Sequence, residues 1–348
     1  MWGEMETGGG APEGALGSMF LPAPATAAET DREVRARLAS SLGWVAEGFA
    51  PLTLPEAGLD GWTARPADFG FYYDLASAVQ HGFADDAREA LGAVADALKQ
   101  SFDASRDTGA SQPRITTLGP DYYSPVEIDC LIRWFDMEPS NAMALVPLEP
   151  DELAAAVTSL NRALAVLQEH APDFFGEFTA ITTEIVFAKP DAGAKLRFGG
   201  ASSFALWGAL ALNVQAHPDW WQYLPRIVHE YSHNLLFGIA RDEPLVLNDP
   251  SETYSSPLRD DARPIDGIYH AAFVSAREAL AMRQIAAGLE PRDEEDAALR
   301  SYVLTTADRS QAVFRDCLAV LREHARLSDL GAAVLADTEA WEASARGP

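Results

Sequence analysis

Residues 218–233 read PDWWQYLPRIVHEYSH, and this stretch decides how the middle of the chain folds. Its aromatic and aliphatic side chains predict a helix buried in the protein interior. His229 and His233 are four residues apart, so they project from one face of that helix and can bind the same metal ion. A metalloenzyme is therefore the first hypothesis. The alternative, two core histidines without a metal, would leave Glu230 buried beside them without a cation.

Composition limits the class of protein. The chain has 348 residues, of which 48% are hydrophobic, enough for one large domain or two closely packed ones. Its net charge is -26, with 26 basic and 52 acidic residues, which argues against a nucleic-acid partner. A field of this sign would attract a basic peptide, although solubility or salt tolerance explains the acidity equally well.

The cysteines and the hydrophobic pattern indicate a cytoplasmic protein. Cys130 and Cys317 are far apart and belong to no Cys-x-x-Cys motif, so two buried thiols are expected rather than a disulfide or a thiolate zinc site. No basic segment followed by an apolar run begins the chain, and no apolar run reaches about 18 residues. We therefore expect neither export nor membrane insertion.

Periodicity predicts a mostly helical α+β protein with a small sheet. Apolar residues at helical spacing predict helices at six places: from Asp31 onward, 85–102, 151–170, 264–287, 293–327 and from Gly331 onward. Strands are expected at 183–188 and in a second segment, with a possible hairpin, formed by 203–207 and 209–213. The order helix, strand, edge strand, metal-ligand helix is the order found in zincin-type metalloproteins.

The expected organisation has four parts. Residues 1–30, rich in Gly, Pro and Ala, are predicted to form a flexible arm. A helical N-terminal region follows over 31–180, and a zincin-like metal-binding core with a small antiparallel or mixed sheet over 181–290. Residues 291–348 are expected to form C-terminal helices that pack on this core.

A catalytic metal needs at least one further protein ligand. Leu236 and Ile239 stand where a metzincin would have Gly and His, which excludes that pattern. Glu252 and Glu278 are not excluded, but neither belongs to a recognisable glutamate-zincin motif. His270 is preferred because it is an imidazole near the start of the next helix. The remaining histidines are expected at the surface or at helix ends: His81, His170, His217 and His324.

A helical wheel at about 100 degrees per residue gives the helix that contains His270 a core face and a polar flank. The predicted core face consists of Ile265, Ile268, Tyr269, Ala272, Phe273, Ala276 and Leu280. Asp266, His270 and Arg277 lie together on the flank. If His270 is no ligand, it is a histidine at the boundary of the core and Arg277 is a solvated cation.

A set of motifs extends this picture. The chain combines His229-Glu230-x-x-His233 with Ser256-Pro257-Leu258-Arg259, Arg263-Pro264, Asp266-Gly267 and Tyr269-His270-Ala271-Ala272-Phe273-Val274, with Arg277 seven residues after His270. Over residues 200–290 it resembles the HExxH-motif peptide-modification enzymes of RiPP biosynthesis, the pathways that modify ribosomally made peptides. Members of that family are 2-oxoglutarate-dependent HExxH peptide β-hydroxylases.

The resemblance implies an enzyme that uses Fe(II), 2-oxoglutarate and dioxygen to hydroxylate the β-carbon of a residue in a ribosomal precursor peptide. His229, His233 and His270 would be the iron ligands. Arg259, Arg263 and Arg277 are the candidates for binding the carboxylates of 2-oxoglutarate, because a guanidinium binds a carboxylate through two hydrogen bonds. Each could instead form a surface ion pair in so acidic a chain.

Two features of this interpretation stay open. The usual non-haem iron triad contains a carboxylate, which Glu252 or Asp266 could supply. Glu230 would then hold an imidazole or a bound water, whereas in a zinc-dependent metallopeptidase, the alternative function, it would be the catalytic general base. A third possibility is a protein that the metal merely stabilises or that binds the leader peptide without catalysis.

Overall fold

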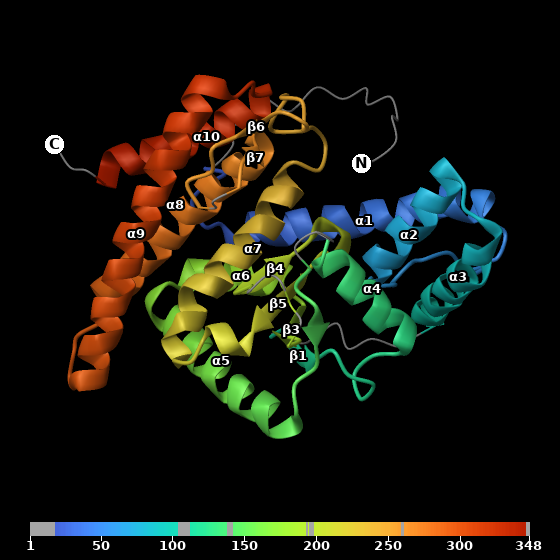
Figure 1. Cartoon of the computed structure of the whole chain (residues 1–348), viewed down its shortest axis with the longest axis horizontal. Coiled ribbons are helices and arrows are strands. Elements are labelled where there is room, and N and C mark those ends of the chain that lie inside the picture. The colour runs from blue at the N-terminus through green and yellow to red at the C-terminus, as the bar shows by residue number, and fades with distance from the viewer. Residues whose placement is uncertain are drawn as a thin grey trace.

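Helices surround a small central sheet (Figure 1). The computed structural model describes residues 18–103, 112–137, 142–192, 194, 198–258 and 261–345. Within these ranges helix predominates, which confirms the mostly helical α+β class. No described helix is long and apolar enough to cross a membrane.

The central sheet is mixed and, among the described residues, has five strands. Parallel strands β1 (Arg114–Thr117), β3 (Glu184–Pro190) and β5 (Ala209–Asn213) lie in the order β1-β3-β5. The edge strand β4 (Gly200–Ser202) pairs with β5 in the antiparallel sense, and β2 (Leu145–Val146) pairs with the end of β3. The predicted strand at 183–188 and the predicted small mixed sheet are therefore confirmed.

The sheet separates two hydrophobic clusters because side chains of a strand alternate between its faces. Ile185 and Phe187 of β3 lie in one cluster, with Leu210 of β5, while Val186 and Ala188 lie in the other. Both faces of these parallel strands are therefore covered by helices, as buried parallel sheets require.

The N-terminal helices lie beside the sheet, in the blue to teal part of Figure 1. They are α1 (Pro24–Gly48), α2 (Pro66–His81), α3 (Arg88–Asp103), which follows the short turn η1 (Asp85–Ala87), and α4 (Pro125–Phe135). The predicted apolar stripe of α1 is confirmed, since Val34, Leu38, Leu42 and Val45 are all buried. Sequence periodicity did not identify α2, α4, β1 or β2.

The prediction of a flexible arm over residues 1–30 is wrong for its second half. Residues 1–17 lie outside the described residues, but Phe20 is fully buried and α1 begins at Pro24. The ring of Phe20 packs edge-on against the ring of Phe273, and its centroid lies 5.2 Å from the ring centroid of Trp341. One aromatic anchor thus holds this segment against helices from the far end of the chain.

Helix α7 (Tyr223–Ile239) carries the two histidines and passes through the interior. It follows the turn η5 (Trp220–Gln222), where the Asp219 amide donates to Gln222 Oε1 at 3.0 Å. Apolar residues around most of its circumference are buried, which is typical of a core helix. It packs on β4 and α1, and on the helices α5 (Pro150–His170), α6 (Pro172–Ile181) and α8 (Ile265–Gly288).

The C-terminal layer consists of α8, α9 (Glu294–His324) and α10 (Asp329–Ala345), which lie together in the orange and red part of Figure 1. The predicted helices at 264–287, 293–327 and from Gly331 onward are confirmed to within a few residues. Of the predicted core face of α8 only Leu280 is partly exposed. Between α7 and α8 the chain forms the short antiparallel strands β6 (Thr253–Tyr254) and β7 (Arg263–Pro264).

The segment before β5 differs from its prediction. A hairpin is present, but its first strand is β4, and the predicted strand at 203–207 is a 3₁₀ turn, η3 (Phe204–Leu206). Gly208 has a φ of +85°, a left-handed conformation that glycine tolerates, and its carbonyl accepts the amides of Thr183 and Glu184. A second 3₁₀ turn, η4 (Val214–Ala216), follows β5.

Both cysteines are free and buried, as predicted.

Helix α7 approaches its neighbours so closely at Gly238 that a larger residue cannot fit. A Cβ atom there would lie 2.5 Å from Thr30 Cγ2 and 2.7 Å from Trp207 Cη2. We expect Gly238→Ala to lower the free energy of unfolding by about 1–3 kcal/mol through overpacking, measured by urea denaturation. The control is Gly43→Ala on α1. A Cβ atom there would meet no atom within 4 Å, so this substitution should be neutral or stabilising by up to about 1 kcal/mol. Equal effects of the two substitutions would contradict this account.

Candidate functional site

The predicted histidine pair faces one point in space. His229 Nε2 and His233 Nε2 are 3.3 Å apart, one helical turn from each other on α7. Two imidazole nitrogens that bind one tetrahedral ion at about 2.0–2.1 Å lie about 3.3–3.4 Å apart. The spacing of the two Nε2 atoms therefore fits a shared metal ion.

The other ring nitrogen of His229 has an acidic partner on α8. His229 Nδ1 lies 3.3 Å from Glu278 Oε2, and the second oxygen of Glu278 accepts the Ser310 hydroxyl of α9 at 2.6 Å. Burial alone would raise the pKa of Glu278, but the hydrogen bond and charge of His229 outweigh it and lower that pKa. Glu278 thus stays ionised and accepts the Nδ1 proton. Metal-binding histidines commonly have a carboxylate at this position, which leaves Nε2 free for the ion.

His233 has a histidine in the corresponding place. Its Nδ1 lies 3.1 Å from His270 Nδ1, and the two rings stack with their centroids 5.4 Å apart. Burial, and then the neighbouring histidines and Arg226, lower the pKa of His233, and burial lowers that of His270. Two neutral imidazoles can share one Nδ1 proton, so His270 orients His233 as Glu278 orients His229.

The predicted set of three histidine ligands does not converge in this structure. His270 directs Nδ1 at the outer nitrogen of His233, not at the point between the two Nε2 atoms. Among the described residues, no group of three or more His, Cys, Asp or Glu side chains is arranged to hold one ion. His270 would have to turn its ring to become the third ligand.

Glu230 is buried and held at both carboxylate oxygens. Oε2 accepts the hydroxyl of Ser202 on the edge strand β4 at 3.0 Å, and Oε1 pairs with Arg226, one turn earlier on α7, at 3.2 Å. The sequence signal for this pair is the i,i+4 spacing of Arg226 and Glu230 on one helix.

Two glycines make room for this ion pair. A Cβ atom at Gly199 would lie 2.9 Å from Arg226 Nη2, and one at Gly200 would lie 2.7 Å from Glu230 Oε1. Only residues without side chains allow the chain leading into β4 to pass so close to α7. The edge strand, the ion pair and the histidine helix therefore form one packed unit.

Arg277 lies in the core rather than on a solvated flank. Its guanidinium is fully buried, forms an ion pair with Glu177 of α6 and donates to the Phe20 carbonyl. It also donates to Ser232 Oγ at 3.0 Å and to Tyr231 Oη at 3.2 Å on α7. These partners occupy the donors that a dicarboxylate would need. The structure thus gives Arg277 a structural place, which excludes the alternative of a solvated cation and counts against its predicted role in cofactor binding.

The other candidates lie in different surroundings. Arg259 lies outside the described residues, and Arg263 pairs with Asp261 at 3.0 Å on the short strand β7. Glu252 accepts the hydroxyl of Tyr254 at 3.3 Å on the surface. Asp266 is exposed, although its charge acts on His270. Neither acidic candidate is brought into a ligand cluster with the histidine pair.

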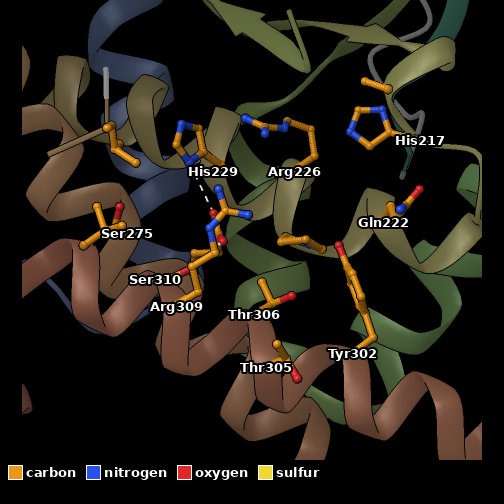
Figure 2. A pocket seen from close by; sticks show the side chains of 15 residues that line it. His217, Gln222, Arg226, His229, Ser275, Tyr302, Thr305, Thr306, Arg309 and Ser310 are labelled. Carbon is orange, nitrogen blue, oxygen red and sulfur yellow. Dashed lines mark hydrogen bonds and ion pairs between the residues drawn. The ribbon is translucent and has the colours of Figure 1, made fainter. Parts of the chain in front are cut away.

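A pocket of about 350 Å³ lies beside His229, between η5, α7, α8 and α9 (Figure 2). Glu278 and Ser310 line it, together with Arg226 and Arg309, neither of which was predicted as a site residue. No local pattern in the sequence links α9 to α7, which is why Arg309 was missed.

His217 also lines this pocket, and of its two predicted places, the surface or a helix end, the structure confirms the second. It lies at the end of the turn η4, is buried, and stacks on Tyr223 with ring centroids 4.8 Å apart, and its Nδ1 lies 2.7 Å from the Asn213 carbonyl. Burial lowers its pKa to about 4, so the ring is neutral at neutral pH. His217 therefore brings no positive charge to the pocket.

Comparison with known proteins adds no family assignment: no protein-family model matches the chain, and no curated protein is similar to it in sequence.

Metal binding tests the division of roles among these residues. We expect His229→Ala and His233→Ala to abolish tight binding of one zinc ion, measured by competition with a chelating dye. Glu278→Gln should weaken binding about 10–100-fold, because His229 loses its carboxylate partner. Glu252→Gln, at an exposed surface carboxylate, is the control and should bind as the unaltered protein does. Unchanged affinity in Glu278→Gln would contradict the orienting role.

The buried cation gives a stability prediction. Replacement of Arg277 by Met leaves Glu177 buried without its partner, so the free energy of unfolding should fall by about 3–5 kcal/mol in urea denaturation. The matched control on the same helix is Arg283→Met, which removes a largely exposed ion pair with Asp308 and should cost less than about 1 kcal/mol. A loss no larger in Arg277→Met than in the control would show that the buried pair is dispensable.

Proposed function

We propose that the protein is an Fe(II)- and 2-oxoglutarate-dependent hydroxylase that acts on the β-carbon of a residue in a ribosomally made precursor peptide. The observation that carries the proposal is the pair of Nε2 atoms 3.3 Å apart, each ring held from behind at Nδ1. A metal-binding core of zincin-like organisation is part of the proposal. Its support is the antiparallel edge strand β4, which lies against the histidine helix α7.

The residues present fit a metal ion in part. His229 and His233 would hold it through Nε2, and His270 would join them after its ring turns away from His233 Nδ1. A site with so few protein ligands leaves positions for a co-substrate and for dioxygen, as oxidative iron chemistry requires. When bound, iron with 2-oxoglutarate and dioxygen would supply the oxidising power that converts a C–H bond into a C–OH bond.

The surroundings of Glu230 favour the hydroxylase over the metallopeptidase. A peptidase needs this carboxylate as a general base next to a metal-bound water. Here one oxygen pairs with Arg226 and the other accepts from Ser202, so both carboxylate oxygens are held in the contact between α7 and β4. Glu230 fits the role of a group that holds the edge strand against α7.

The chain's own residues then divide the work. Glu278 fixes the imidazole of His229, so that its Nε2 lone pair stays aimed at the ion, and His270 holds the ring of His233 until it turns to join the ligands. The pocket beside His229 would hold the small co-substrate. The acidic chain as a whole would attract a basic precursor peptide, since its net charge is -26.

Succinate formation from 2-oxoglutarate by anaerobically iron-loaded protein, followed by addition of oxygen, tests the proposal. We expect turnover with iron and oxygen, and at least a 100-fold loss in His229→Ala and His233→Ala. Zinc-loaded protein is the control for metal-independent decay of 2-oxoglutarate. No succinate from iron-loaded protein, even with a candidate precursor peptide present, would refute the hydroxylase.

Glu230→Gln separates the two enzyme classes. A metallopeptidase should lose about 10²–10⁴-fold in peptide cleavage, because its general base is gone. A hydroxylase should keep most of its turnover, since glutamine can still accept from Ser202. Peptide cleavage by the zinc form that disappears in Glu230→Gln would favour the peptidase.

A further inference from the structure

Within the part of the chain that the structure describes, Arg309 has no carboxylate partner, although the protein is strongly acidic. Among the described arginines, only Arg32, Arg300 and Arg309 form no ion pair. Arg309 alone of these three lines the pocket beside His229. Acidic residues outnumber basic ones 52 to 26, so a guanidinium left unpaired in a pocket is available to a ligand anion.

The side chain of Arg309 points into the pocket toward His229. In Figure 2 its guanidinium lies beside the His229 ring, while the hydroxyls of Tyr302 and Thr306 line the side of the pocket formed by α9. Burial raises the pKa of Tyr302, so its hydroxyl stays protonated. One face of α9 therefore presents a cation and hydroxyl groups to the same space.

The other charges of the pocket are already balanced. Arg226 is paired with Glu230, and both oxygens of Glu278 are engaged, by His229 and by Ser310. His217 is neutral at neutral pH. Arg309 is thus the pocket's uncompensated charge among the described residues, and its natural partner is a carboxylate that enters from solution.

We propose that this pocket binds a short dicarboxylate, with one carboxylate on Arg309 and the other end directed toward His229 and His233. This assignment rests on the proposed function, in which 2-oxoglutarate is such a molecule, and it replaces Arg277 as the anchoring arginine. A planar guanidinium binds a carboxylate through two parallel hydrogen bonds, and the α9 hydroxyls add donors beside it. The volume of about 350 Å³ suits a small ligand rather than a bulky one.

Direct binding tests the proposal without any turnover. Zinc-loaded protein, which is redox-inert, would be titrated with 2-oxoglutarate and with succinate by isothermal titration calorimetry. Arg309→Ala should weaken binding about tenfold or more, and Arg309→Lys should recover only part of the affinity, because a lysine lacks the paired donors. The matched control is Arg300→Ala, which removes another unpaired, exposed arginine of α9 outside the pocket and should bind as the unaltered protein does.

The outcomes separate this proposal from the proposed function. Equal affinities of Arg309→Ala and Arg300→Ala, or no binding of either dicarboxylate to the unaltered protein, would overturn the assignment of Arg309. So would an effect of Arg309→Ala on N-acetyl-aspartate amide but not on 2-oxoglutarate, which would mark the pocket as a receptor for an acidic peptide side chain. Dicarboxylate binding that depends on Arg309, without hydroxylation of any peptide, would leave the pocket assigned and refute only the hydroxylase.

Discussion

The structure depends on one buried cation. Arg277 of α8 connects α6 through Glu177, the N-terminal segment through the Phe20 carbonyl, and α7 through Tyr231 and Ser232. Such a charge is tolerated in the interior only when every donor is matched, so these elements can approach each other in few ways. Because Ser232 directly precedes His233 in the chain, the same contact fixes the rotation of α7 relative to α8.

The orientation of the histidines follows from that packing. With α7 and α8 fixed against each other, Glu278 lies behind His229 and His270 lies behind His233, each at Nδ1. Both Nε2 atoms then face one point. Gly199, just before β4, and Gly200, in β4, leave room for the Arg226–Glu230 ion pair between this strand and α7. The carboxylate of the HExxH motif is therefore part of the contact between helix and sheet.

Helix α9 completes the site from a third direction. It packs along α8, supplies Ser310 to Glu278 and lines the pocket with Tyr302, Thr306 and Arg309. The pocket therefore combines an imidazole from α7, a carboxylate from α8 and a guanidinium from α9. The charged and polar groups of the pocket are thus brought together by the packing of three helices, and no single sequence motif contains them.

The sequence by itself determined what lies within single elements. The spacing of Val34, Leu38, Leu42 and Val45 predicted α1, and the spacing of four residues predicted that His229 and His233 share a helix face. These inferences are sound because helix periodicity is local and repeats every 3.6 residues. The same local reasoning failed for residues 203–207, where the left-handed conformation at Gly208 and the bonds to its carbonyl set the turn.

Only the tertiary structure decided how separate elements meet. A helical wheel placed Arg277 and His270 on one flank but could not show that this flank faces Glu177 rather than solvent. It could not show that Glu278 stands behind His229, or that Arg309, eighty residues later, points into the same pocket. The physical reason is that periodicity fixes the angle of a side chain about its own helix axis. The distance, rotation and sliding of one helix against another are set by packing and by buried charge, which residues far apart in the sequence supply together.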